Sequence, residues 1–210
     1  MTWTSSVGRA CGVLLDAIVR LLALSRINPN FLTLMGLVVN TYAAFLFGYA
    51  NGDNQRRMFL YAGLVIIGSG FFDLVDGRVA RASNQVTRFG GFFDSIVDRY
   101  SDASLFLGLL VFYGRGNRFF YVVLAALAMI SAIMVSYARA RAESLIGTCR
   151  VGFMERPERL VLLIIGALFN VMAPVLWVIA VLSTITVIHR VLYTWQRTRE
   201  MDGLAPTRAA

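Results

Sequence analysis

The chain has 210 residues, of which 58% are apolar and only 15% are charged, and its mean hydropathy is +0.66. Water-soluble domains carry about 25% charged residues, so this composition excludes an ordinary soluble domain and indicates an integral membrane domain. All 20 basic residues are arginine, and with 12 acidic residues they give a net charge of +8. In a membrane protein this excess favours anionic lipid headgroups and phosphorylated molecules as partners rather than nucleic acid.

The first segment, residues 1–27, is expected to be an amphipathic helix that lies on the membrane surface. Leu14 and Ile18 belong to its apolar side, whereas Arg9 and Asp16 recur on the other side. Apolar and charged residues alternate with a helical period in this way in interfacial helices. We therefore expect an interfacial helix ahead of the membrane-spanning part of the chain.

Residues 28–199 are expected to form one domain of six transmembrane helices, followed by a disordered polar tail at 200–210. A helix needs about 20 residues to cross a bilayer. The last apolar block, residues 160–189, is too long for one span, and Asn170 and Pro174 indicate a break within it. The fold class is therefore an all-α integral membrane protein. Its expected spans lie at about 31–50, 58–81, 89–113, 119–143, 160–169 and 174–198.

The distribution of arginine predicts the orientation of these spans. With six spans both chain ends lie on the same side, and four arginines then lie on the opposite side, namely Arg56, Arg57, Arg115 and Arg118. Basic residues are in excess in cytoplasmic loops. We therefore expect a multi-pass protein of the cell (inner) membrane whose two termini face the cytoplasm.

Residues 73–98 carry four aspartates, at the polar ends of two apolar stretches where isolated carboxylates are costly and usually functional. The spacing is D-x2-D-G-x2-A-R-x8-G-x3-D-x3-D. On a helix, Asp73 and Asp76 share one face, and so do Asp94 and Asp98. Two such helices side by side bring four carboxylates together, which requires protons or divalent cations. Hard oxygen ligands favour Mg²⁺, Mn²⁺ or Ca²⁺ over zinc. All four aspartates are expected to be metal ligands, with Mg²⁺ or Mn²⁺ as the expected ion.

Three further residues between the aspartates suit a phosphate-binding site. Gly77 and Ala80 leave room for a nucleotide to approach the helix backbone, and Arg81 can neutralise phosphate charge. A structural role is the alternative, in which the aspartates pair with arginines or line the cation pathway of a polytopic carrier. Such carriers usually contain inverted repeats, and the sequence has no internal repeat.

The segment 73–98 resembles the signature of the CDP-alcohol phosphotransferases, membrane enzymes of phospholipid synthesis, and every fixed position of that signature is filled. The six-span layout and the segment PNFLT at 29–33 extend the resemblance over nearly the whole chain. It implies a homodimer and two divalent ions around the diphosphate of CDP-diacylglycerol. It also implies that Asp98 is the base that deprotonates the acceptor alcohol, so that CMP is released.

Residues at the start of the first span and around the aspartate motif are the candidates to contact the CDP group. Asn30 and Thr33 begin the first span and are candidates to bind the cytidine or sugar, although Asn30 could equally cap the helix. Asp102, one turn beyond Asp98, is expected to orient an arginine such as Arg99, and metal ligation is its alternative role. The complete expected set of CDP-binding residues is Asn30, Thr33, Asp73, Gly77, Ala80, Arg81 and Thr87.

A cluster of arginines predicts a second phosphate site. Arginine forks bind phosphate with two hydrogen bonds, so the cluster favours a phosphorylated acceptor, although some members could instead extend to lipid headgroups as membrane anchors. The cluster lies near the ends of the last three spans, on the same side as the aspartates. Its members are Arg139, Arg141, Arg156, Arg159 and Arg190.

Two segments, 136–143 and 152–160, resemble the actinobacterial phosphatidylinositol phosphate synthases, which join CDP-diacylglycerol to inositol 1-phosphate. The resemblance implies that Arg139, Arg156 and Arg190 bind the acceptor phosphate. The position of Arg139 is commonly lysine in those enzymes and is arginine here. Glycerol 3-phosphate, which would give phosphatidylglycerol phosphate, is the alternative acceptor.

Overall fold

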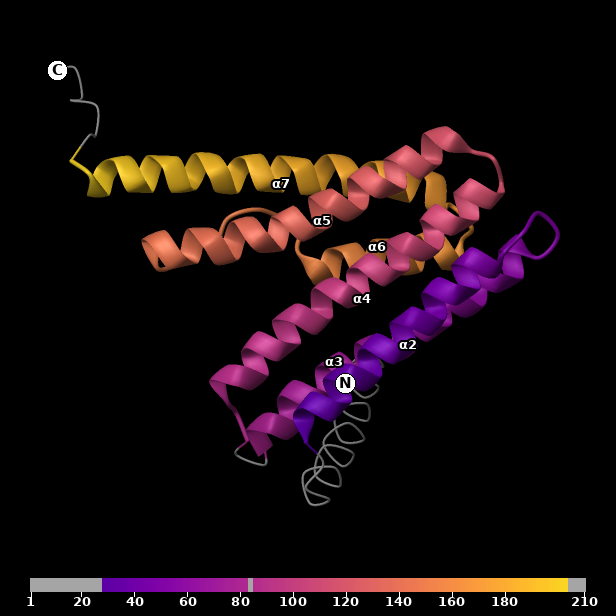
Figure 1. Ribbon diagram of the computed structural model, residues 1–210, viewed down its shortest axis with the longest axis horizontal. Helices are drawn as coiled ribbons and strands as arrows, with labels where there is room; N and C mark the ends of the chain where they lie inside the picture. Colours follow the sequence, from indigo (N-terminus) through magenta and orange to yellow (C-terminus); the bar gives the residue numbers. More distant parts are fainter. Residues whose placement is uncertain (1–27, 83–84, 204–210) are drawn as a thin grey trace, which may run out of the picture.

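The computed structural model describes residues 28–82 and 85–203 (Figure 1). These residues contain no strand, so the predicted all-α membrane architecture is confirmed. The expected interfacial helix at 1–27 and the residues from 204 onwards lie outside the described part. The helices are α2 (Pro29–Tyr49), α3 (Gln55–Ala82), α4 (Arg88–Arg115), α5 (Phe119–Ile146), α6 (Arg156–Leu168) and α7 (Met172–Met201).

Four of these helices, α2, α3, α5 and α7, are long and apolar enough to cross a membrane, which makes the chain a multi-pass membrane protein. α4 has 28 residues but includes charged residues of the aspartate motif. α6 has only 13 residues, so it is about 20 Å long, whereas the hydrocarbon core of a bilayer is about 30 Å thick. The count of six spans therefore stays a prediction.

The helices run up and down, and their three short connections at 50–54, 116–118 and 169–171 gather on the right of Figure 1. α2 packs against α3 and α4, and α5 packs against α7 and α4. α6 lies between the two groups and contacts α3 and α7. The helices that carry the aspartates, α3 and α4, are thereby brought next to the helices that carry the arginine cluster.

The contact between α2 and α4 is close because small residues meet there. A methyl group added at Gly108 would overlap the backbone of Ala44. Deeper along the same interface, Asn40 Nδ2 donates a buried hydrogen bond of 2.5 Å to Ser101 Oγ. Small and polar residues join membrane helices in this way. This packing fixes the position of α4, and hence of Asp94 and Asp98, relative to α2.

An aromatic core lies near the connection end of the bundle. Phe59 of α3 makes edge-on contacts with Phe47 of α2 and Phe112 of α4, with ring centroids 5.0 and 4.9 Å apart. Phe47 and Phe59 are fully buried, and such pairs contribute about 0.5–1.5 kcal/mol beyond their buried area. The polar cavities described next lie toward the other end.

Candidate active site

The first cavity lies between the start of α2, the end of α3 and the start of α4, and has a volume of about 270 Å³. We call it the α2–α4 cavity. Five of the seven predicted CDP-binding residues line it, together with Asp94 of the aspartate motif. The predictions for the side chains of Asp76 and Ala80 fall outside what the structure describes. The five residues are Asn30, Thr33, Gly77, Arg81 and Thr87.

Capping interactions hold the two helix starts that form this cavity. Asn28, not Asn30, is the N-cap of α2, since its side chain accepts a hydrogen bond from the backbone of Asn30. The capping alternative for Asn30 is therefore wrong. Thr87 caps α4, because its Oγ1 accepts from the backbone nitrogen of Gly90 at 2.9 Å. A methyl group at Gly90 would lie 3.0 Å from Thr87 Oγ1 and 3.4 Å from Asn30 Oδ1.

Two of the predicted metal ligands, Asp73 on α3 and Asp98 on α4, converge on one cation. Nη1 of Arg156 lies 2.8 Å from Asp73 Oδ2 and 2.9 Å from Asp98 Oδ1. The backbone of α2 also lies close to Asp73, because a methyl group at Gly36 would lie 3.2 Å from Asp73 Oδ1. Asp94, one turn before Asp98 on α4, lines the α2–α4 cavity.

The donor set fits a divalent cation by its chemistry. Asp73 and Asp98 are joined by a single positive group from α6, and carboxylate oxygens are the ligands that Mg²⁺ prefers. Among the described residues, no three His, Cys, Asp or Glu side chains form a complete ligand cluster. A site with few protein ligands suits Mg²⁺, which usually keeps waters and binds substrate phosphates as well.

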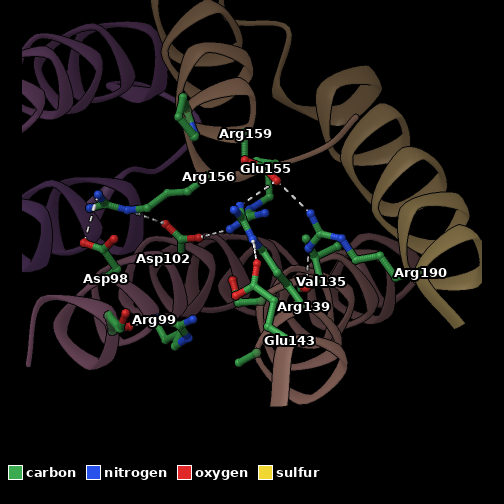
Figure 2. Close-up of a pocket in the computed structure, with 14 residues that line it drawn as sticks. Asp98, Arg99, Asp102, Val135, Arg139, Glu143, Glu155, Arg156, Arg159 and Arg190 are labelled. Carbon is green, nitrogen blue, oxygen red and sulfur yellow. Dashed lines mark hydrogen bonds and ion pairs between the residues drawn. The ribbon is translucent and has the colours of Figure 1, made fainter. Parts of the chain in front are cut away.

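The second cavity, which we call the arginine cavity, has a volume of about 360 Å³ and lies between α4, α5, α6 and α7 (Figure 2). Asp98 lies at one end of it in Figure 2 and Arg190 at the other. Arg139 and Arg156 also line it, so the structure brings together all three predicted acceptor-binding arginines. Arg141 is not among its lining residues.

Arg190 is held rigidly at the end of this cavity. It is 1% exposed. Its Nε donates to the carbonyl of Val151 at 2.9 Å and its Nη1 donates to the carbonyl of Val135 at 2.6 Å. Its Nη2 lies 2.7 Å from Oε1 of Glu155. Because the backbone takes two of its nitrogens, only Nη2 is directed to an anionic group.

The loop that carries Val151 is fixed against α7. Gly152 has a φ of +100°, which L side chains rarely adopt, and a methyl group there would overlap Thr186. Two residues later the backbone nitrogen of Met154 donates to Thr186 Oγ1 at 3.1 Å. The loop therefore needs glycine at this position to reach Arg190.

Glu155 is a residue of the cavity that the sequence analysis missed. Its Oε1 accepts hydrogen bonds from Arg139 Nη1 at 2.9 Å and from Arg190 Nη2 at 2.7 Å. Glu143 accepts from Arg139 Nε at 3.0 Å. The sequence did contain a signal for Glu155, because acidic residues stand next to the clustered arginines in the segment MERPER at 154–159.

Asp102 forms a buried ion pair with Arg159. Arg159 Nη2 lies 2.5 Å from Asp102 Oδ2, and the two residues are 2% and 5% exposed. Asp102 Oδ1 lies 3.6 Å from Nε of Arg156. Arg99 instead donates to the backbone carbonyl of Ser95. The arginines that Asp102 orients are therefore Arg159 and Arg156, and the expectation for Arg99 is wrong.

The chain was compared with known proteins by sequence. Residues 26–194 match the family model of CDP-alcohol phosphatidyltransferases. The archaetidylinositol phosphate synthase of Pyrococcus horikoshii is 38% identical over 178 residues, which cover 84% of this chain and 88% of the relative. The phosphatidylinositol phosphate synthase of Streptomyces avermitilis is 33% identical, with 84% of this chain and 76% of the relative covered.

Solved structures show the same similarity. The phosphatidylinositol phosphate synthase PgsA1 of Mycobacterium tuberculosis with CDP-DAG bound has a TM-score of 0.78 and 28% identity, covering 93% of this chain and 98% of that chain. The same enzyme in complex with manganese and citrate gives a TM-score of 0.76, with 93% of each chain covered and the same identity. The carrier alternative is therefore wrong. The chain belongs to the CDP-alcohol phosphatidyltransferase family and is a membrane-embedded phosphatidyltransferase of phospholipid synthesis.

Proposed function

We propose that this enzyme transfers the phosphatidyl group of CDP-diacylglycerol to inositol 1-phosphate and releases CMP. The observation that carries this proposal is the arginine cavity, where Arg139, Arg156 and Arg190 share one space with Asp98. An acceptor that bears a phosphate can bind to the arginines. Its hydroxyl group can then lie next to the carboxylate of Asp98.

The α2–α4 cavity is the proposed site of the CDP group. Asn30 and Thr87 supply polar groups near the helix starts, and Arg81 supplies a positive charge for phosphate. The relative PgsA1 has been solved with CDP-DAG bound, which supports a CDP-linked lipid as the donor. The acyl chains of such a lipid can remain in the bilayer while its headgroup enters the cavity.

The proposed metal ligands are Asp73, Asp76, Asp94 and Asp98, holding two Mg²⁺ or Mn²⁺ ions. The relative in complex with manganese supports divalent metal use. When bound, such ions neutralise the diphosphate and the departing CMP. A chelator is expected to abolish turnover, and added Mg²⁺ or Mn²⁺ is expected to restore it.

Asp98 is the proposed base of the reaction. Its carboxylate takes the proton of the acceptor hydroxyl as the acceptor oxygen attacks the phosphorus on the lipid side of the diphosphate. A bond forms between that oxygen and phosphorus, and the bond from this phosphorus to the CMP oxygen breaks. A base in this role typically contributes about 10²–10⁴-fold to the rate. Arg156, which contacts Asp98 at 2.9 Å, can hold the carboxylate in position.

The proposed assembly is a homodimer in the cell membrane, with six spans and both cavities open to the cytoplasm. Four arginines, Arg56, Arg57, Arg115 and Arg118, lie at or near the connection end of the bundle, whereas both cavities lie toward the opposite end. The larger share of arginines at the cavity end supports the cytoplasmic orientation.

The proposal is tested by supplying purified enzyme with CDP-diacylglycerol and Mg²⁺ and measuring CMP release. Inositol 1-phosphate, glycerol 3-phosphate, serine and free inositol are offered in turn. Release with inositol 1-phosphate is the expected result. Release with glycerol 3-phosphate alone would identify a phosphatidylglycerol phosphate synthase instead. An archaetidyl donor belongs in the same series, because one relative is an archaetidylinositol phosphate synthase.

A further inference from the structure

Glu155 lies between Arg139 and Arg190, two of the three arginines that are proposed to bind the acceptor phosphate. A single oxygen, Oε1, accepts hydrogen bonds from both guanidinium groups, at 2.9 and 2.7 Å (Figure 2). One oxygen shared by two arginine forks is the arrangement that a phosphate oxygen would adopt. We propose that the Glu155 carboxylate is an internal counter-anion, which occupies the phosphate position and is displaced when the phosphorylated acceptor binds.

This inference rests on the proposed function, and the fixed position of Arg190 is its first support. Arg190 is buried, and the carbonyl groups of Val135 and Val151 hold two of its nitrogens. Its guanidinium group cannot turn toward a ligand elsewhere without losing these hydrogen bonds. A phosphate that binds Arg190 must therefore meet Nη2, where the carboxylate of Glu155 lies.

The second support is the freedom of the Glu155 side chain. Its side chain is 40% exposed, whereas that of Arg190 is 1% exposed. Glu155 is the N-cap of α6 and forms a capping box, in which its side chain accepts from the backbone nitrogen of Glu158 and its own nitrogen donates to Oε2 of Glu158 at 3.1 Å. A turn of the Glu155 side chain into the open part of the cavity would give up the first of these contacts, while the second still holds the helix start.

The third support is the balance of charge. Five arginines and four acidic residues line the arginine cavity. Without Glu155, the forks of Arg139 and Arg190 would converge with no anion between them, and like charges at this distance repel. The carboxylate keeps the two forks converged before the acceptor arrives. The carboxylate also sets a threshold of affinity. A ligand displaces it only if that ligand binds the guanidinium groups of Arg139 and Arg190 more strongly than the carboxylate does.

This threshold gives Glu155 a role in specificity. A phosphate monoester carries up to two negative charges and three acceptor oxygens, so it can replace a single carboxylate on two arginine forks. A neutral polyol has no group that can do so, and the carboxylate of an amino acid gains nothing over Glu155. Discrimination of this kind works by penalising the wrong ligand.

The test compares Glu155→Gln with Glu143→Gln in the purified full-length enzyme. Both variants remove one negative charge next to Arg139, but Glu143 accepts from Nε and has no hydrogen bond with Arg190 among those of the described residues. Binding of inorganic phosphate is measured by calorimetry, and the KM for inositol 1-phosphate is measured by CMP release. Glu155→Gln is expected to tighten phosphate binding and to lower the KM, each by about tenfold, which corresponds to about 1.4 kcal/mol. Glu143→Gln removes a charge from Arg139 alone, so it is expected to change each by a smaller factor, about threefold or less.

Weaker phosphate binding in Glu155→Gln would overturn the inference, because it would mean that Glu155 only positions the arginines. Equal tightening in both variants would also overturn it, since a general loss of negative charge would then explain the effect. Phosphate binding does not depend on turnover. If the wild-type enzyme released no CMP with inositol 1-phosphate, the proposed function would fail while the calorimetric comparison would still decide the role of Glu155.

Discussion

Asp94 and Asp98 lie one turn apart on α4 and line different cavities. Asp94 lines the α2–α4 cavity and Asp98 lines the arginine cavity. The same helix therefore places one carboxylate beside the proposed CDP site and the next beside the proposed acceptor site. A transferase needs its two substrates to meet at the reacting phosphorus, and we propose that they meet at the turn of α4 between these two aspartates.

Asp98→Asn is expected to lower the rate of CMP release by at least about 100-fold, because an amide cannot accept the acceptor's proton. CDP binding should remain within a few-fold of wild type, since Asp73, Asp76 and Asp94, three of the four proposed metal ligands, are left in place. Turnover and calorimetric binding of CDP in the presence of Mg²⁺ measure the two effects separately. Loss of CDP binding along with turnover would mean that Asp98 is chiefly a metal ligand.

Gly90→Ala is expected to weaken CDP binding by about tenfold, because its methyl group would crowd Thr87 Oγ1 and Asn30 Oδ1 in the α2–α4 cavity. Gly68→Ala is the control, since a methyl group there meets no atom within 4 Å and Gly68 is not among the residues that line the cavity. Both variants replace glycine with alanine within a helix, so their effects on helix propensity are similar. Equal weakening in both would contradict the assignment of this cavity to the nucleotide.

Arg190→Lys and Arg139→Lys should differ in their effect on the acceptor. Arg190 uses three nitrogens for three partners in fixed directions, and a single ammonium group cannot reproduce this fork. We expect the KM for inositol 1-phosphate to rise by about tenfold or more in Arg190→Lys. Arg139 is 40% exposed at its side chain and hydrogen-bonds the carboxylates of Glu143 and Glu155, which an ammonium group can also contact, so Arg139→Lys should stay within about threefold. A larger rise in this KM in Arg139→Lys than in Arg190→Lys would contradict the roles assigned to the two arginines.

The ion pair between Asp102 and Arg159 is expected to be important for stability. Removing one partner of a buried pair leaves an uncompensated charge, which costs about 3–5 kcal/mol. Asp102→Leu should therefore lower the melting temperature of the enzyme in detergent, and the double variant Asp102→Leu with Arg159→Met should recover much of the loss. A double variant that melts lower than Asp102→Leu would show that the two residues do not act as a pair.

Much of the fold was predictable because the polar turns interrupt the apolar stretches clearly. The helix bounds lie within a few residues of the expected spans, except that α6 begins at Arg156 rather than near residue 160. Glu158, which accepts a hydrogen bond from the backbone of Glu155, helps to define that start. A hydropathy profile does not detect this start of α6, because three of its first four residues are charged.

The separation of the site into two cavities was predictable only in part. The aspartate spacing predicts which side chains share a helix face, and the arginine cluster predicts a second phosphate site. The roles of Glu155 and Asp102 depend on contacts between residues 35 and 57 positions apart in the chain. No pattern within one helix predicts those contacts, because they arise from the packing of α4, α5, α6 and α7.

The most direct test of the central claim is the identity of the lipid product. Purified enzyme is incubated with CDP-diacylglycerol, Mg²⁺ and inositol 1-phosphate, and the lipids and CMP are quantified by mass spectrometry. The account predicts one CMP for each molecule of a lipid that contains two phosphate groups, one from the donor and one from the acceptor. Release of CMP with phosphatidic acid as the lipid product, or a single-phosphate lipid formed from free inositol at the same rate, would contradict it.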